Sequence, residues 1–201
     1  MDESSNARLR LFVAIAIPLP VRHEMMAIQQ ELKPLELGEV RWTNAEQIHL
    51  TLKFLGNVPA SSVEAVKQSL EEVCVATAPF RVRAKGIGFF PNECRPRVRW
   101  VGFEGDDNSL AGLQKHVERR LAPFAEKAGA ENFLAHATLG RFPKYRRHKT
   151  EIVLPRMRAL ANHVFGEWCA EDVGLFRSEL STEGARHTKV AVFPFGASLG
   201  M

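Results

Sequence analysis

The stretch HLTLKFLG, residues 49–56, is an apolar segment that opens with a histidine, and HATLGR, residues 136–141, opens in the same way. Both contain histidine, any residue, threonine and leucine in that order. The chain has 7 histidines among its 201 residues, so two copies of this pattern are a poor fit to chance. Short apolar runs are typical of strands. We therefore expect two related strands.

The polar side chains of both motifs stand at alternate positions. Because residues two apart on a strand point to the same side, His49, Thr51 and Lys53 should share one face. In the second motif His136 and Thr138 should share a face for the same reason. The apolar side chains of the first motif should point the other way, into a core: Leu50, Leu52 and Phe54.

Hydrophobic patterns in the rest of the chain predict further strands and helices. Apolar residues recur every three or four positions over 21–32, which predicts a first helix. A capping box at residue 61 opens a second helix. A third is expected over 109–127, where Pro123 kinks or shortens it. Strands are expected at 9–18, 40–43, 49–55, 80–90 and 98–103, from residue 136, and within 164–180 and 189–194. This order predicts an α+β protein.

No low-complexity linker divides the chain. We expect a short tail at residues 1–7 followed by one domain at residues 8–201, which is long enough to bury a substantial core. Each motif strand accompanies a helix and further strands. A two-lobed architecture with a loose internal duplication is therefore expected.

The composition is that of a globular protein, with 45% hydrophobic and 25% charged residues. No apolar run approaches the roughly 20 residues of a membrane span. The apolar run at 11–17 follows acidic and polar residues and precedes no cleavage pattern, so we interpret it as a strand and not as a signal peptide. The 3 cysteines lack metal-site or disulfide spacing. We expect a cytoplasmic protein.

The formal net charge is +4, from 27 basic and 23 acidic residues. Basic residues cluster at 81–86, 95–100 and 140–149, and aromatic residues are interleaved in the last two clusters. Such clusters are either solvated strand and loop surfaces or contacts to a polyanion. The sequence leaves both interpretations open.

Two imidazoles and two hydroxyls facing each other would make a poor zinc site, since zinc usually takes three or four nitrogen, sulfur or carboxylate ligands. They are suited to general acid and base catalysis, because one imidazole can be neutral and the other protonated near neutral pH. Opening a cyclic phosphodiester needs such a pair on opposite sides of phosphorus. The threonine hydroxyls can donate hydrogen bonds to the non-bridging oxygens. No metal ion or cofactor is required.

The residues that carry these features resemble a known family. RLFVAIAIP (10–18), RW (41–42), IHLTLKFLG (48–56), GIGFFP (86–91) and HATLGR (136–141) are similar to segments of the RNA 2′,3′-cyclic phosphodiesterases of the two-histidine (2H) phosphoesterase superfamily. These LigT-like proteins are also called RNA 2′,5′-ligases. The resemblance covers nearly the whole chain, from about residue 8 to residue 195.

The resemblance implies two lobes, each an antiparallel sheet with helices on its outer face, and a cleft between them. It implies hydrolysis of a terminal 2′,3′-cyclic phosphate to a 2′-phosphate without metal. His49 would be the proton donor to the leaving 3′ oxygen and His136 the acceptor that activates water. Thr51 and Thr138 would hold the phosphate. The expected substrate is an RNA with a cyclic phosphate end or a cyclic nucleotide, and we expect a monomer without an obligate protein partner.

Arg141 matches the arginine that often closes the second motif in that family, and a guanidinium suits forked contact with phosphate. Strict alternation puts Arg141 on the Leu139 face, so it reaches the cleft only if Gly140 permits a bulge or the strand has ended. Several aromatic residues are candidates to stack on a base as well as candidates for the core. They are Trp42 and Phe12, together with Phe54, Phe89 and Phe90.

The five histidines outside the motifs receive no role at this stage: His23, His116, His148, His163 and His187. Two further functions remain open. One is reversible 2′,5′ ligation, which is the same bond chemistry in reverse. The other is a module that binds RNA ends without turnover, although binding alone has no need of a matched acid and base.

Overall fold

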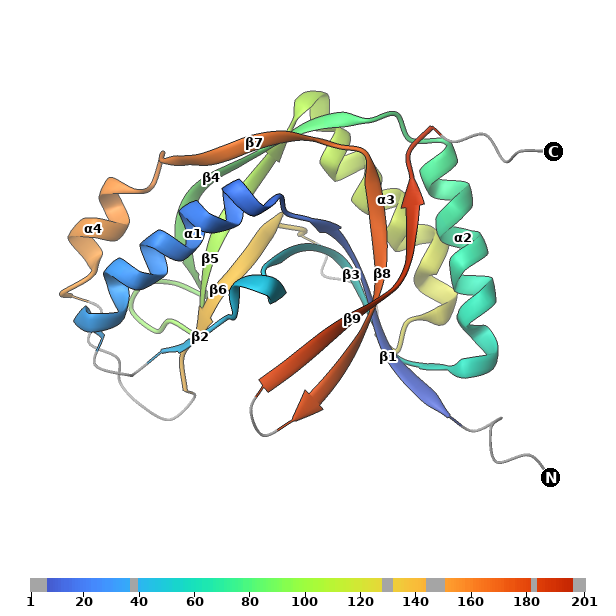
Figure 1. Ribbon diagram of the computed structural model, residues 1–201, viewed down its shortest axis with the longest axis horizontal. Coiled ribbons are helices and arrows are strands. Elements are labelled where there is room, and N and C mark those ends of the chain that lie inside the picture. Colours follow the sequence, from blue (N-terminus) through green and yellow to red (C-terminus); the bar gives the residue numbers. More distant parts are fainter. Residues whose placement is uncertain (1–6, 37–39, 128–131, 144–150, 182–183, 197–201) are drawn as a thin grey trace.

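The computed structural model describes residues 7–36, 40–127, 132–143, 151–181 and 184–196. Two antiparallel sheets form its frame (Figure 1). The four-stranded sheet has the order β3-β1-β8-β9, and the five-stranded sheet the order β2-β6-β5-β4-β7. The strands are β1 (Arg8–Ala16), β2 (Arg41–Trp42), β3 (His49–Pro59), β4 (Phe80–Phe90), β5 (Val98–Gly105), β6 (His136–Arg141), β7 (Val164–Ala170), β8 (Asp172–Ser181) and β9 (Gly184–Pro194).

Helices flank both sheets on the outside. Figure 1 shows α2 (Val63–Val75) and α3 (Ser109–Leu121) on one flank of the molecule and α1 (Leu19–Leu32) and α4 (Leu154–Ala159) on the opposite one. One motif strand lies in each sheet, β3 in the four-stranded and β6 in the five-stranded sheet. The predicted α+β class and the two-lobed arrangement are confirmed.

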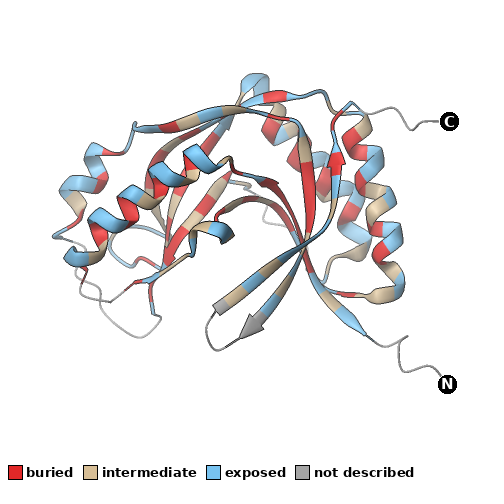
Figure 2. Cartoon of the chain, viewed as in Figure 1, coloured by how far each residue is buried: buried red, intermediate tan, exposed pale blue. Residues whose placement is uncertain are grey.

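The helices form where the apolar stripes predict them. Figure 2 shows buried residues along the inward sides of the helices and along the strands. The expected stripe of α1 is buried, with Val21, Met25, Ile28 and Leu32 in the core. Pro123 limits α3 as expected, because the helix ends at Leu121 and a 3₁₀ turn follows. Burying these stripes against the sheets supplies the main favourable free energy of folding.

Four details differ from the sequence-based expectation. The capping box is not formed, because a 3₁₀ turn at Ala60–Ser62 precedes α2 and no side chain caps it. The segment 164–180 is divided at Glu171, so that β7 joins one sheet and β8 the other. The helix α4 was not predicted, and β9 begins at Gly184, before the expected residue 189.

Some expectations concern residues outside the described ranges. The tail at 1–6, the basic residues 144–149 and His148 belong to this group. Among the described residues, no helix is both long and apolar enough to cross a bilayer.

Candidate active site

His49 stands at the first position of β3 and is held on two sides. Its ring hydrogen-bonds to the backbone carbonyl of Gln47, two residues earlier. It also stacks on Phe12 of β1, with ring centroids 4.7 Å apart and an interplanar angle of 26°. The ring of Phe176 on β8 stacks on Phe12 at 5.3 Å and on His49 at 6.3 Å. The four-stranded sheet therefore fixes the plane of this imidazole.

His136 begins β6 in the same way. Its Nδ1 lies 2.8 Å from the backbone oxygen of Leu134, again two residues earlier. Since a carbonyl can only accept, Nδ1 carries the hydrogen and the neutral ring presents a bare lone pair at Nε2. Phe90 of β4 meets the ring edge to face at 4.9 Å. The second imidazole is thus oriented by the five-stranded sheet.

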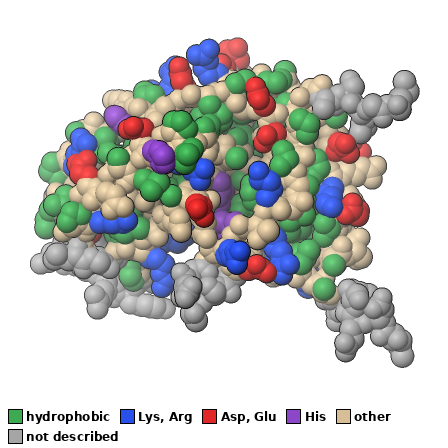
Figure 3. All heavy atoms as spheres, viewed as in Figure 1, with side chains coloured by type: hydrophobic (Ala, Val, Ile, Leu, Met, Phe, Trp, Pro, Cys, Tyr) green, Lys and Arg blue, Asp and Glu red, His purple; other side chains and the backbone are tan. Residues whose placement is uncertain are grey.

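The two motif strands contact one another, so the two lobes bring the histidines into one site. Figure 3 shows histidine side chains recessed between the two halves of the molecule. Burial, the largest cause, acts together with the charges of His187 and His136 to lower the pKa of His49 from its ordinary 6.5 to about 4. Burial also lowers the pKa of His136, and the charge of Arg141 adds to this effect. Both shifts favour the neutral form of the imidazole.

Each motif strand contains a bulge at its leucine. In the pairing of β1 with β3, Thr51 and Lys53 face successive residues of β1, which leaves Leu52 as an extra residue. In the pairing of β5 with β6, Leu139 is the extra residue at the equivalent position. A bulge shifts the alternation by one residue. The two strands thus share a distortion as well as a sequence pattern.

The first bulge corrects the predicted faces of Lys53 and Phe54. Lys53 turns away from His49, is 4% exposed, and places Nζ 2.5 Å from Oε1 of Glu118 on α3. Phe54 turns to the His49 face, where its ring lies 5.8 Å from that of Phe12, and it is 61% exposed. Strict alternation was wrong here because it assumed an undistorted strand. The exposed phenyl ring consequently belongs to the candidate site.

The second bulge has the matching effect on Arg141. The residue pairs with Val98 and stands three positions after Thr138, on the same face, as Phe54 stands three after Thr51. Its side chain is exposed, and its charge lowers the pKa of His136. The condition for Arg141 to reach the cleft, a bulge near Gly140, is therefore met at Leu139.

The other residues singled out in the sequence differ in how they lie relative to the two histidines. Thr51 and Thr138 are half-buried and share the faces of their histidines. Phe12 is 1% exposed and packs beneath His49, so it has no free face for a base. Trp42 pairs with Gly140 and covers the guanidinium of Arg99 at 5.1 Å, so the structure does not bring it together with the histidines.

Sequence reasoning missed His187. This residue lies on β9, and its ring centroid is 5.2 Å from that of His49 and 4.8 Å from that of Phe12. No sequence signal marks it, because it stands alone in a polar segment and its neighbours come from β1 and β3. The tertiary arrangement alone reveals a third imidazole at the site.

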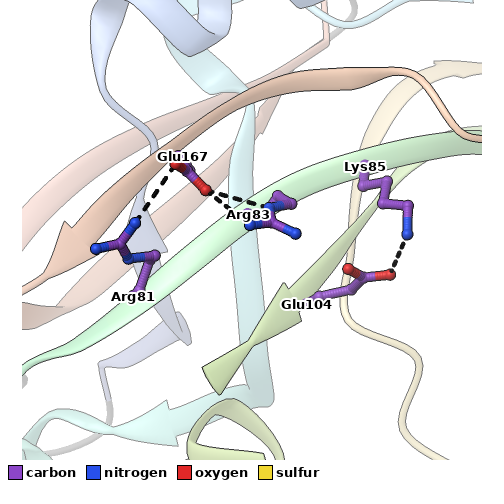
Figure 4. Close-up of polar contacts among 5 residues, drawn as sticks. All are labelled: Arg81, Arg83, Lys85, Glu104 and Glu167. Atoms are coloured by element: carbon purple, nitrogen blue, oxygen red, sulfur yellow. Dashed lines mark hydrogen bonds and ion pairs between the residues drawn. The ribbon is translucent and has the colours of Figure 1, made fainter. Parts of the chain in front are cut away.

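The basic cluster at 81–86 is engaged in cross-strand ion pairs (Figure 4). Glu167 of β7 accepts from Arg83 at 3.1 Å and lies 3.5 Å from Arg81, and Glu104 of β5 pairs with Lys85 at 3.2 Å. The carboxylates neutralise much of this charge. This favours the solvated-surface interpretation of that cluster.

The side chains that most often bind metal ions are imidazole, thiolate and carboxylate groups. Within the described ranges, no group of three or more histidine, cysteine, aspartate and glutamate side chains is placed to hold a metal ion. The side chains gathered at the candidate site offer imidazole, hydroxyl and guanidinium groups.

Comparison with known sequences relates this arrangement to a family. A family described as LigT-like phosphoesterase matches residues 15–100. A protein of Aquifex aeolicus named RNA 2′,3′-cyclic phosphodiesterase is 31% identical over 193 residues, which cover 94% of this chain and 98% of that protein. A protein of Archaeoglobus fulgidus with the same name is 30% identical over 185 residues, which cover 92% of this chain and 99% of that protein.

Solved structures agree in fold. TT0787 of Thermus thermophilus superposes with a TM-score of 0.76 at 28% identity, covering 94% of this chain and 98% of that one. Escherichia coli LigT complexed with 3′-AMP gives a TM-score of 0.74 at 21% identity, with the same coverage. The similarity to these structures extends across both lobes.

Proposed function

Because this chain belongs to the LigT-like phosphoesterases, we propose that it hydrolyses 2′,3′-cyclic phosphodiester ends of RNA, or of nucleotides, to 2′-phosphomonoesters. The observation that carries the proposal is the duplicated histidine and threonine pair. Each imidazole bonds to the carbonyl two residues before it, and the two strands that bear them are in contact. The names of the relatives support the same reaction.

In the proposed mechanism His136 is the base. Its Nδ1 is committed to the Leu134 carbonyl, so the lone pair on Nε2 is available to accept a proton from water. The water oxygen then forms a bond to phosphorus as the bond from phosphorus to O3′ breaks. The lowered pKa of His136 keeps the ring neutral at physiological pH. The role of acceptor thus agrees with its hydrogen bonding and its electrostatics.

His49 is the acid, which gives its proton to the departing O3′. Its pKa of about 4 in the free protein leaves it neutral at pH 7. A phosphodiester anion in the cleft favours the protonated ring, because an opposite charge nearby raises the pKa of a histidine. Protonation of His49 is therefore coupled to substrate binding. Thr51 and Thr138 donate hydrogen bonds to the non-bridging oxygens, where negative charge is held in the transition state.

The proposal is tested with a 2′,3′-cyclic nucleotide and a short RNA ending in a cyclic phosphate, both incubated with EDTA. Phosphorus NMR or chromatography should detect the 2′-monoester as product. Absence of product from both substrates would contradict the proposal and favour an RNA-end binding module. Activity that EDTA abolishes and a divalent metal restores would contradict the metal-free mechanism.

A further inference from the structure

His187 is the third imidazole at the site, and it comes from the edge strand of the four-stranded sheet. Its ring stands nearly perpendicular to that of His49, at 84° and 5.2 Å between centroids. It stands at 74° and 4.8 Å to the ring of Phe12. The His49 ring, already stacked on Phe12, therefore meets a second ring at right angles. These contacts restrict rotation of the His49 imidazole about its side-chain bonds.

One ring nitrogen of His187 is not satisfied by the protein. Nδ1 is buried and has no hydrogen-bond partner among the described residues. A buried N–H without an acceptor costs more than a buried lone pair on an aromatic nitrogen, so the neutral ring carries its hydrogen on Nε2. Protonation would place an unpartnered N–H at Nδ1 in the interior. Burial accordingly lowers the pKa of His187.

We propose that His187 is a positioning residue for His49, which fixes the plane of the His49 imidazole and competes with it for a proton. This inference rests on the proposed function for its catalytic meaning. His187 touches no reacting atom in this assignment, and it acts through the acid that does.

The competition follows from the charges around His49. On β6 the facing titratable groups are His136 and Arg141, and on β9 they are His187 and, on the same sheet face, Lys189. On β1 the same face carries Arg10 beyond Phe12.

All of these groups are cationic or become cationic on protonation, and no carboxylate of the described ranges contributes to the shift of the His49 pKa. Two adjacent imidazoles do not both take a proton readily in such surroundings. A phosphodiester anion supplies the missing negative charge. His187 thereby sharpens the dependence of proton uptake by His49 on the presence of substrate.

The test compares three variants with the wild type. His187→Phe keeps a ring of similar size but removes the titratable group, and His187→Gln keeps a polar donor. The matched control is His163→Phe, because His163 also stands edge to face on a phenyl ring, Phe165, at 4.8 Å and 90°. The ligand-free proteins are labelled at histidine, and the pKa of His49 is read by NMR, with the signal assigned from His49→Gln.

We expect the His49 pKa to shift upward from about 4 in both His187 variants and to stay unchanged in the control. The pH profile of kcat/KM on a cyclic nucleotide should shift in the same direction, while KM changes less than kcat. An unchanged His49 pKa in His187→Phe and His187→Gln, with folding verified by circular dichroism, would overturn the inference. Because the NMR titration needs no turnover, an inactive wild type would contradict the proposed function and still leave His187 tested.

Discussion

The buried ion pair between Arg99 and Glu36 offers a sharp test of how the second motif strand is supported. Arg99 is fully buried on β5 opposite Gly140, and its two terminal nitrogens lie 2.7 and 2.5 Å from the Glu36 oxygens. Three aromatic rings lie within 5.4 Å of its guanidinium carbon. Glu36→Gln keeps the shape of the side chain but leaves the guanidinium charge in the interior without a counter-ion.

Removal of one partner from a buried pair costs about 3–5 kcal/mol. For a chain of this length each kcal/mol lowers Tm by about 2–4 °C. We therefore expect Glu36→Gln to lower Tm by roughly 6–20 °C in a thermal scan followed by circular dichroism, with a matching fall in the urea midpoint.

The control is Glu31→Gln, which breaks an equivalent fork with Arg156 at 2.6 and 2.9 Å. Both side chains of that pair are more than 40% exposed. An exposed pair contributes about 0–1 kcal/mol, so the control should lose no more than about 4 °C. Equal losses in the two variants would refute the reasoning, because burial is the main difference between the pairs.

Three further predictions concern the site itself. The folded-state pKa of His49, about 4, lies below its ordinary 6.5, so between these pH values the unfolded state binds more protons and the free energy of unfolding falls as the pH drops. Measured by urea unfolding, the wild type should lose up to about 3 kcal/mol more stability than His49→Gln between pH 7 and pH 4. Equal losses in the two proteins would argue against a buried neutral ring. Arg141→Gln should lower kcat/KM by roughly 10–100-fold through loss of a charged phosphate contact, while Arg119→Gln on the exposed side of α3 leaves it unchanged; similar effects of both would argue against a specific role. Phe54→Leu should change stability by less than about 0.5 kcal/mol because the ring is exposed, yet raise KM for an RNA end severalfold through lost base stacking, and an unchanged KM would remove Phe54 from the substrate site.

The sequence predicted which strands carry the site better than it predicted the side of each strand to which their side chains point. The repeated motif, the helical stripes and the α+β class are local patterns, and a single sequence displays them directly. The bulges at Leu52 and Leu139 are not local in this sense, because they arise from the register against β1 and β5. For that reason the sides of Lys53 and Phe54 were predicted wrongly, and the side of Arg141 was left undecided.

Contacts between distant segments were the other source of error. The break at Glu171 sends two adjoining strands into different sheets, and only the choice of partners decides this. β9 and β3 are opposite edge strands of the four-stranded sheet, yet the rings of His187, His49 and Phe12 meet in mutual contact, with centroids 4.7–5.2 Å apart. The contact of the Trp42 ring with the buried guanidinium of Arg99 is likewise a contact between distant segments that the sequence did not reveal.

The central claim is that His49 and His136 act as one acid and base pair without metal. The most direct measurement is the rate of hydrolysis of an RNA ending in a 2′,3′-cyclic phosphate, in EDTA, for wild type, His49→Ala, His136→Ala and the double variant. We expect each single variant to lose on the order of 10³-fold or more, and the double variant to lose little further, because residues that act as a unit are not additive. Retention of activity by either folded single variant, or losses that multiply in the double variant, would contradict the account.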